Sequence, residues 1–532
     1  MTGAGTKETR RARRGGWGWI AVAALLFAAG FALANRFQLT HSVLYRLAAG
    51  DAASAATAFL FLSMQAALLL AASWLLPRRW FAAILALAGA SILVNIGYGQ
   101  VIGAPLDAAT LDWMLAEARQ AGNAAGEFTA PLLLAVAQTV AALALLAGSR
   151  VLARRSGRLP AWPRALPALL ILLIVPSLAY RLADVWPESA ERNLYGLAWD
   201  VATAEAPPPR AAPALRPTPE GAALAPRHIV WVIDESVARA PFERIIGPLL
   251  TRTPHIDFGV TAAMANCSAP AHVALRSGVD VRRAGPGIDL RRTPSIWGYA
   301  RAAGYRTLLI DGQTSGAPQN LLLPPERALI ERVLSMKGGI DTDLKIADRL
   351  NAELKSRGRT FSYAVLRGVH FQYRDHYPLG TIPADAPVAR QYATALAWSK
   401  RRFFARLLAG VDRDDVAIVY TSDHGQNLRP GALPHCSREP VADEFRVPLL
   451  AFLPARFADH YAEAPRDGHS ASQILPATLG WMGYDSAAVA ARYDNDLTRP
   501  TARYVWFGRA VIPIAAGGEV DVHAGSNFPG TK

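Results

Sequence analysis

The first third of the chain consists of long apolar runs separated by short polar loops. Five runs are close in length to the roughly 20 residues that cross a bilayer as a helix. They cover approximately residues 17–35, 55–76, 80–98, 130–148 and 164–182. Tryptophans stand at or near the ends of these runs, where aromatic side chains gather at membrane interfaces. The pattern predicts a domain of five transmembrane helices over residues 1–183.

Lysine and arginine are shared unevenly between the loops of this region. They are concentrated before the first run, after the second and after the fourth, and they are sparse in the other loops. Because positively charged loops stay in the cytoplasm, we expect a cytoplasmic N-terminus and a periplasmic C-terminal domain at a bacterial inner membrane. The same loops account for much of the net charge of +14. No nucleic-acid-binding motif accompanies that charge, so we expect no nucleic-acid partner.

Two segments lead from the apolar region to the rest of the chain. Residues 105–122, in the loop after the third run, carry apolar residues at helical spacing. A helix there would either lie on the outer membrane surface or pack on its own domain. Residues 184–226 are rich in proline and alanine in their second half and predict an extended linker. Residues 227–532 would then form a separate domain.

Four apolar runs in this domain end in polar residues. They are HIVWVIDES (228–236), YRTLLIDGQ (305–313), FSYAVLRGVH (361–370) and VAIVYTSDHG (416–425). Helical patterns lie between them, such as TPSIWGYARAAG, in which Thr293 would be the N-cap and Gly304 would end the helix. Alternating strands and helices are typical of a doubly wound, mostly parallel α/β sheet. Such sheets bind ligands at the carboxyl ends of their strands.

Charged residues follow the first and the last of these runs. Glu235 follows one, and the pair Asp423 and His424 follows the other. Charge is costly to bury, but a metal ion at the sheet edge would make these groups tolerable. Two carboxylates and an imidazole suit Zn²⁺ or Mn²⁺, and Gly425 would give the backbone freedom to turn. The alternative is an aspartate that caps the next helix beside a structural histidine.

Ser268 lies in MANCSAPAHVALRSG, just before a short helical pattern with Pro270 in its first turn and Gly278 after its last. The N-terminus of a helix attracts anions such as a phosphoryl group. A metal ion beside the hydroxyl would lower the pKa of that hydroxyl and favour its action as a nucleophile. The alternative is that Ser268 only caps the helix.

The order of these motifs resembles the alkaline phosphatase/sulfatase superfamily. Within it, the chain is most similar to the membrane phosphoethanolamine transferases, which modify lipid A and related envelope glycans. The resemblance covers nearly the whole chain, from the apolar spans to the exported domain. It implies zinc-dependent transfer of phosphoethanolamine from a membrane phospholipid, most plainly phosphatidylethanolamine, to an envelope glycolipid or glycan through a phospho-Ser intermediate.

The resemblance also assigns roles to individual residues. Through VIDES, NCSAPA and YTSDHGQN, the implied metal ligands are Glu235, Ser268, Asp423 and His424. Ser268 is the implied nucleophile. His370, in VLRGVHFQYRDHYP, and His435, in LPHCSREP, are implied to assist at the substrate phosphate, and His435 could instead bind a second metal. The segment GHSASQILPATLGWMGY is similar to a structural segment of the family.

Four features depart from the family pattern. Ser268 stands where threonine is usual, and Asp234 stands where glycine is usual, which brings another carboxylate close to the implied metal. The Gly-Pro that usually follows the equivalent of His370 is absent. The Cys or Ser before Pro-Ser-Arg that sulfatases oxidise to formylglycine is also absent, which disfavours sulfatase activity.

The two cysteines of the chain, Cys267 and Cys436, lie next to Ser268 and His435. Both are expected outside the cytoplasm, where disulfides form. Given the site that the resemblance implies, we expect a disulfide between the nucleophile loop and the His435 loop, the alternative being two free thiols. Four other histidines are expected at the surface or in supporting positions: His272, His376, His460 and His469.

The sequence leaves several functions open. A phosphoglycerol transferase, or a phosphatase, phosphodiesterase or sulfatase-type hydrolase of the same superfamily, would use similar residues. A catalytically silent membrane scaffold is the alternative from a different class of protein. The acceptor could be lipid A, lipopolysaccharide core, a periplasmic glucan or an exopolysaccharide.

Overall fold

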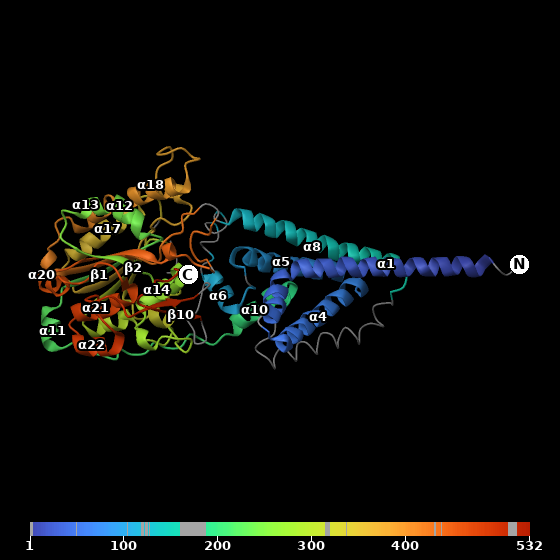
Figure 1. The fold of residues 1–532 in the computed structure, drawn as a ribbon, viewed down its shortest axis with the longest axis horizontal. Coiled ribbons are helices and arrows are strands. Elements are labelled where there is room, and N and C mark those ends of the chain that lie inside the picture. The colour runs from blue at the N-terminus through green and yellow to red at the C-terminus, as the bar shows by residue number, and fades with distance from the viewer. Residues whose placement is uncertain are drawn as a thin grey trace. The chain divides into compact units, whose positions relative to one another are not determined.

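The computed structural model describes most of the chain. The described residues are 4–48, 50–103, 105–116, 118, 122, 126, 128–159, 188–313, 320–336, 338–429, 432–437, 439–508 and 519–531. They divide into two compact units (Figure 1). The first comprises Met1–Asp112 and Phe128–Ala204, and the second comprises Trp113–Glu127 and Glu205–Lys532.

The first unit contains, among the described residues, four helices that are long and apolar enough to cross a membrane. They are α1 (Ala4–Ala34), which is apolar over Trp17–Ala34, α4 (Ala52–Leu75), α5 (Arg78–Ile102) and α8 (Thr129–Arg155). They coincide with the first four predicted spans. The fifth predicted span, residues 164–182, lies outside the described residues.

Shorter elements lie between and after these helices. They are α2 (Arg36–Leu39), the π-helical turn Thr40–Leu44, α3 (Tyr45–Ala48), α6 (Ala108–Ala116) and α10 (Ala190–Thr203). The element α6 falls within the helix predicted near 105–122. Leu106 and Leu111 pack with Leu197 of α10 in one buried cluster. These two leucines therefore pack on the protein rather than lying on a membrane surface.

The predicted extended linker 184–226 differs from the structure in its first half, because α10 is a packed helix. Ser91 Oγ on α5 donates a hydrogen bond to Ala190 O over 2.6 Å. Asn193 Nδ2 on α10 donates one to Asn95 Oδ1 on α5, also over 2.6 Å. A backbone carbonyl and a polar side chain of α10 thus find partners on α5, which holds the helix in place.

The second unit is built on an eight-stranded sheet. Its strands are β1 (His228–Asp234), β2 (Ile256–Ala262), β3 (Arg306–Asp311), β4 (Arg332–Ser335), β5 (Thr360–Val365), β6 (Val416–Ser422), β7 (Arg446–Phe452) and β8 (His469–Ser470). They lie in the order β4-β3-β5-β1-β6-β7-β2-β8. The first five of these are parallel, as predicted, whereas β7 runs antiparallel to both neighbours. A separate pair joins β9 (Arg503–Phe507) to β10 (Val520–Ala524).

The central strand β1 separates two hydrophobic cores, because successive side chains of a strand point to opposite faces. Trp231 packs in one core and Val232 in the other. Helices cover both faces (Figure 1). One core includes residues from α12 (Arg239–Ile245), α13 (Gly247–Leu250), α17 (Thr342–Leu354), α18 (Val388–Lys400) and α19 (Phe403–Leu408). The other includes residues from α14 (Ser268–Arg276), α15 (Ile296–Ala302), α21 (Ile474–Trp481) and α22 (Ser486–Tyr493).

Three short α-helices of this unit are α11 (Pro219–Leu224), α16 (Pro324–Arg327) and α20 (Ala455–Ala458). The expected N-cap of α15 is wrong by two residues. Ser295, rather than Thr293, precedes the helix and accepts a hydrogen bond from Trp297 N. Gly304 follows the helix with φ of +80°, a conformation that suits glycine at a helix end.

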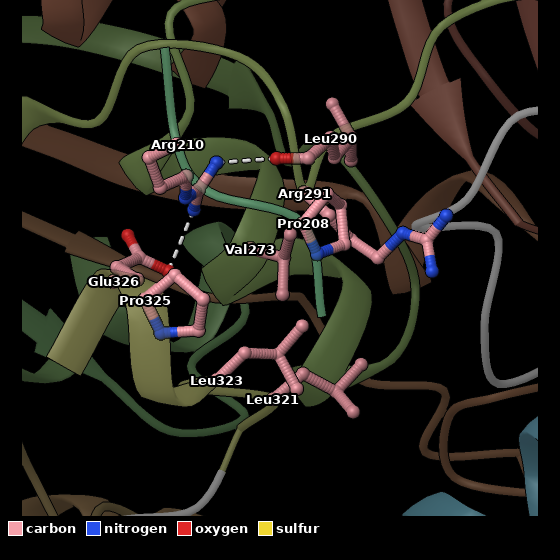
Figure 2. A pocket seen from close by; sticks show the side chains of 9 residues that line it. All are labelled: Pro208, Arg210, Val273, Leu290, Arg291, Leu321, Leu323, Pro325 and Glu326. Carbon is pink, nitrogen blue, oxygen red and sulfur yellow. Dashed lines mark hydrogen bonds and ion pairs between the residues drawn. The ribbon is translucent and has the colours of Figure 1, made fainter. Parts of the chain in front are cut away.

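Residues 205–226, the second half of the predicted linker, belong to the second unit and pack against its α/β domain. Arg210 is the anchor of this segment (Figure 2). Its guanidinium pairs with Glu326 over 2.6 Å and donates to Leu290 O. Arg276, near the end of α14, pairs with the same carboxylate over 3.3 Å. Further along, Pro217 forms a β-bridge with Tyr484.

We predict that Arg210→Ala destabilises the second unit. The change leaves Glu326 with only one of its two buried arginines, and breaking a buried pair costs about 3 kcal/mol at the lower end of the usual range. Chemical denaturation of the full-length protein in detergent measures the loss. Arg216→Ala, an exposed arginine of the same segment, should change the free energy of unfolding by less than about 0.5 kcal/mol. Equal effects of the two variants would contradict the anchoring role.

Candidate active site

Two adjacent parallel strands bring the predicted metal ligands together. β1 pairs with β6 so that Asp234 lies opposite Ser422. The next residues along each strand, Glu235 and Asp423, therefore leave the sheet at the same level. The backbone holds this register beyond the strands, because Asp423 N donates to Asp234 O over 3.0 Å.

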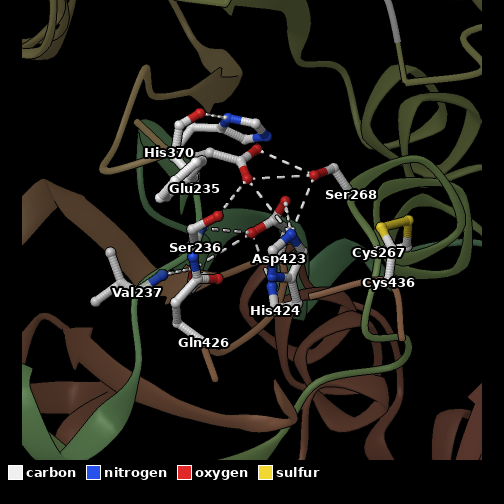
Figure 3. A network of polar contacts seen from close by, with 12 residues as sticks. Glu235, Ser236, Val237, Cys267, Ser268, His370, Asp423, His424, Gln426 and Cys436 are labelled. Atoms are coloured by element: carbon white, nitrogen blue, oxygen red, sulfur yellow. Dashed lines mark hydrogen bonds and ion pairs between the residues drawn. A yellow bond between two sulfur atoms is a disulfide. The ribbon is translucent and has the colours of Figure 1, made fainter. Parts of the chain in front are cut away.

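The side chains of Glu235, Asp423 and His424 form a buried cluster. One ligand atom from each lies within 4.8 Å of the others. His424 Nε2 is 3.4 Å from Glu235 Oε1 and 3.6 Å from Asp423 Oδ2. Figure 3 shows these groups directed toward one another. The convergence predicted from the strand ends is present in the fold.

The donor set fits a divalent cation. Asp423 Oδ1 accepts hydrogen bonds from Ser236 N and His424 N, whereas Asp423 Oδ2 is buried without a hydrogen-bond partner. His424 Nδ1 lies 2.8 Å from Gly425 O. A proton on Nδ1 would be held by this carbonyl, which leaves the Nε2 lone pair free to bind a metal. A buried carboxylate oxygen without a partner and an oriented imidazole are what such a site requires.

Ser268 is the first residue of α14, and Cys267 occupies the N-cap position without a side-chain cap bond. The Ser268 hydroxyl lies 3.3 and 3.2 Å from the two oxygens of Glu235 and 3.2 Å from His424 Nε2. The hydroxyl thus contacts the proposed metal ligands and does not cap the helix. Its place at a helix N-terminus also puts it where anions are favoured.

Two more predicted residues, His370 and His435, lie beside this cluster. The ring of His435 stacks on that of His424 at 4.5 Å between centroids. The ring of His370 meets that of His435 edge-on at 5.2 Å. His370 comes from the loop after β5, the strand on the other side of β1. All six predicted site residues therefore gather at one edge of the sheet.

The expected disulfide between Cys267 and Cys436 is present. Hydrogen bonds reinforce the same junction. Cys436 N donates to Asn266 O over 2.8 Å, and Asn266 Nδ2 donates to Ser437 O over 2.9 Å. The loop that carries Ser268 is therefore fixed to the loop that carries His435.

Burial and neighbouring charges shift the pKa values of the cluster. Burial alone would raise the pKa of Glu235, but the hydrogen bond and charge of His424 hold that pKa well below its usual value. Burial and the charge of Glu235 raise the pKa of Asp423 to about 8. Burial lowers the pKa of His424, but the charges of Asp423 and Glu235 outweigh it and raise that pKa to about 9. In the absence of a metal, the cluster thus holds protons at neutral pH.

Two residues at the cluster were not predicted from the sequence. Gln313, two residues beyond β3, donates from Nε2 to Glu235 Oε2 over 2.6 Å. Ser236 donates from Oγ to Glu235 Oε1 over 2.7 Å and has a φ of +61°. Both come directly after predicted strands. Their position at the carboxyl edge of the sheet was therefore the one feature of the sequence that could have marked them as site residues. Their amide and hydroxyl are too common in loops to point to a site.

Two expectations about neighbouring residues need correction. Asp234 does not bring its carboxylate to the metal cluster, because Lys400 and Tyr420 engage its two oxygens. Gly425 is a described residue, and it is not one of the glycines that have a positive, left-handed φ. A Cβ at this position would lie 2.1 Å from Asp443 O. Close backbone approach, rather than freedom to turn, therefore explains the glycine.

None of the four other histidines singled out joins the metal cluster found among the described residues. His272 is buried, with Nδ1 2.7 Å from Tyr363 OH and Nε2 3.9 Å from Asp423 Oδ2. Burial lowers its pKa to about 3. His376 and His469 are buried, whereas His460 pairs with Asp496 near the surface. His272 is thus a supporting residue behind the cluster.

We predict that zinc binding releases protons and strengthens as pH rises. The cluster of Asp423 and His424 holds protons at neutral pH, and a metal ion must displace them. Because their pKa values are raised, affinity should increase through the range from about pH 6 to about pH 9, by up to about a hundredfold per unit while two protons are released. Calorimetry in buffers of different ionisation enthalpy counts the protons. Affinity that does not change with pH, without proton release, would contradict this electrostatic account.

We also predict that the double variant Cys267→Ser and Cys436→Ser has a lower free energy of unfolding. The disulfide spans 169 residues, and closing a loop of this size stabilises by up to about 5 kcal/mol in the chain-entropy model. Chemical denaturation with and without reductant measures the difference. Reductant should destabilise the unmodified protein and leave the double variant unchanged. Equal stability of the two proteins under oxidising conditions would rule out this contribution.

Comparisons with known proteins show what the second unit and the fold of the chain are similar to. A family model described as Sulfatase matches residues 227–484. No curated protein matches the sequence. The integral membrane protein lipooligosaccharide phosphoethanolamine transferase A (EptA) from Neisseria meningitidis is 15% identical, with a TM-score of 0.56 over 90% of this chain and 99% of that chain.

Two structures of separate periplasmic domains are also similar. The C-terminal periplasmic domain of EcEptC from Escherichia coli, in complex with Zn, is 18% identical, with a TM-score of 0.47 over 60% of this chain and 98% of that chain. The periplasmic domain of phosphoethanolamine transferase EptC from Campylobacter jejuni is 14% identical, with a TM-score of 0.41 over 52% and 94%. Residues 227–484 thus match the sulfatase family model, and the chain shares its fold with the full-length transferase EptA.

Proposed function

We propose that the chain transfers phosphoethanolamine from a membrane phospholipid to an envelope glycolipid or glycan through a covalent phospho-Ser268 intermediate. The observation that carries the proposal is the position of the Ser268 hydroxyl, within 3.3 Å of Glu235 and His424 at the N-terminus of α14. The fold shared with the full-length lipooligosaccharide transferase supports this choice of substrates.

The metal-binding part of the site would consist of Glu235, Ser268, Asp423 and His424. Two carboxylates, an imidazole and a hydroxyl favour Zn²⁺, with Mn²⁺ as the alternative. When bound, the ion would supply Lewis-acid chemistry, which lowers the pKa of a hydroxyl and offsets negative charge on phosphate oxygens.

The first step breaks one ester bond and forms another. Ser268 Oγ gives up its proton and attacks the phosphorus of the donor, the bond from phosphorus to the glycerol oxygen breaks, and diacylglycerol leaves as its oxygen takes a proton. The free N–H groups at the start of α14 face the phosphate oxygens and stabilise their charge.

The second step returns the enzyme to its starting state. An acceptor hydroxyl or phosphate attacks the phosphoserine, and Ser268 regains a proton. His370 and His435, whose rings lie 5.2 Å apart, would bind the phosphate or pass protons. Burial and the charge of His424 lower the pKa of His435 well below its usual value, so that His435 is neutral and can accept a hydrogen bond.

The apolar helices fit a lipid donor. Four candidate spans among the described residues precede the catalytic unit. A chain held in the membrane meets its phospholipid substrate by diffusion in two dimensions, and the leaving diacylglycerol can remain in the bilayer. We place this reaction at a bacterial inner membrane, with the catalytic unit in the periplasm, on the basis of the charge distribution in the loops.

The test is mass spectrometry of Ser268 after the full-length protein has been incubated with labelled phosphatidylethanolamine. We expect a phosphoethanolamine adduct on Ser268 and release of labelled diacylglycerol, both lost in Ser268→Ala. Ser486→Ala is a matched control, because Ser486 is the exposed first residue of α22. Labelling with phosphatidylglycerol alone would indicate a phosphoglycerol transferase. Release of phosphoethanolamine to water at the same rate with and without acceptor would indicate a hydrolase.

A further inference from the structure

A buried lysine lies beside the site and takes no part in the proposed chemistry. Lys400, the last residue of α18, has 0% of its surface exposed. Its three donors have three partners: Asp234 Oδ1 at 3.0 Å, Asp343 Oδ2 at 2.6 Å and Ser399 Oγ at 2.8 Å. A charge so deep in a protein is retained only with such complete pairing.

One partner of this ammonium fixes the backbone at the metal cluster. Asp234 Oδ1, besides its contact with Lys400, accepts a hydrogen bond from Glu235 N over 3.0 Å. Tyr420 donates its hydroxyl to Asp234 Oδ2. The carboxylate that the sequence placed close to the metal is thus held between Lys400, Tyr420 and the backbone of Glu235.

The other partner fixes the loop that carries His370. Asp343, in the first turn of α17, accepts hydrogen bonds from Arg367 N over 2.8 Å and from Gly368 N over 3.3 Å. Two residues further along the chain is His370, whose ring meets that of His435. The Asp343 carboxylate therefore sets where this loop leaves the sheet.

The backbone at Glu235 and the loop that carries His370 also touch directly. Val369 N donates to Glu235 O over 3.1 Å. Gly368 has a φ of +61°, and a Cβ there would lie 2.4 Å from Glu235 O. The loop lies tightly on the backbone of the metal ligand, so a shift of either one displaces the other.

We propose that Lys400 is a positioning residue for the transfer reaction, an inference that rests on the proposed function. Its ammonium joins Asp234, which orients Glu235, to Asp343, which orients the His370 loop. One cation thereby fixes the position of the metal ligand Glu235 relative to the loop that carries the phosphate-binding residue His370. The alternative is an ion pair that stabilises the fold and has no effect on the geometry of the site.

Removing each carboxylate separately tests the two ends of this arrangement in the full-length protein in detergent. Asp234→Ala should weaken zinc binding by about 10- to 100-fold, as loss of a group that orients a metal ligand does. Asp234→Asn retains the acceptor for Glu235 N and should restore zinc affinity to within about threefold of the unmodified protein. Zinc affinity is measured by competition with a chelator, without substrate.

Asp343→Ala should give the opposite pattern. Zinc affinity should stay within about threefold, whereas kcat at saturating zinc should fall by about a hundredfold with little change in KM, because the His370 loop is misplaced by a fraction of an ångström to an ångström. Hydrogen exchange of residues 366–370 should rise in this variant and not in Asp234→Asn. Lys400→Met should show both defects.

The control is Asp257→Ala, which removes another partly buried ion pair, that of Asp257 with Arg239. It should lower the melting temperature and leave zinc affinity and kcat unchanged. The proposal is overturned if Asp234→Ala and Asp343→Ala behave like this control. If either alanine variant fails to fold, Asp343→Asn against Asp234→Asn makes the same comparison, with the turnover defect expected only in Asp343→Asn.

The two proposals fail in different ways. If the unmodified protein binds zinc but releases no diacylglycerol, the proposed function is wrong. The positioning role of Lys400 could still be measured, because Asp234→Ala should lower zinc affinity and Asp343→Ala should raise hydrogen exchange of residues 366–370. If turnover is present but the contrast is absent, Lys400 serves the fold alone.

Discussion

The parallel pairing of β1 with β6 is the constraint on which the site depends. It places Glu235 and Asp423 at the same level of one sheet edge, although 188 residues separate them in the chain. The pairing of β1 with β5 adds His370 from the other side. Backbone hydrogen bonds thus decide which side chains meet, and the helices on either face keep the strands in register.

The site that results concentrates ionisable groups where water is largely excluded. Burial and the charge of Glu235 raise the pKa of Asp423, and the neighbouring carboxylates raise the pKa of His424 against the effect of its burial. Such a cluster is stable with protons or with a cation. The Ser268 hydroxyl is held against it by α14, and α14 is fixed at its start by the disulfide and at its end by Arg276. A nucleophile that cannot move away from its activating groups is a requirement of phosphoryl transfer.

The sequence was sufficient to predict the parallel core of the sheet and the residues that gather at its carboxyl edge. Apolar runs that end in Glu235, His370 and Asp423 are strands with polar carboxyl ends, and strand order in α/β folds brings such ends together. The antiparallel β7 was not predicted, because a short apolar strand carries no signal of its direction. The role of Asp234 was misjudged because its partner, Lys400, is 166 residues away and belongs to a helix. The docked segment around Arg210 was missed for the same reason, since proline-rich composition does not reveal a buried ion pair.

The central claim is that Glu235, Asp423 and His424 hold a divalent cation against the Ser268 hydroxyl. A crystal structure of the protein with zinc, with data collected at the zinc absorption edge, tests it directly. The account predicts one anomalous peak about 2.0–2.2 Å from the ligand atoms of all three residues, with Ser268 Oγ facing it. A zinc-loaded protein whose peak lies elsewhere, or whose Ser268 hydroxyl points away from the cluster, would contradict it.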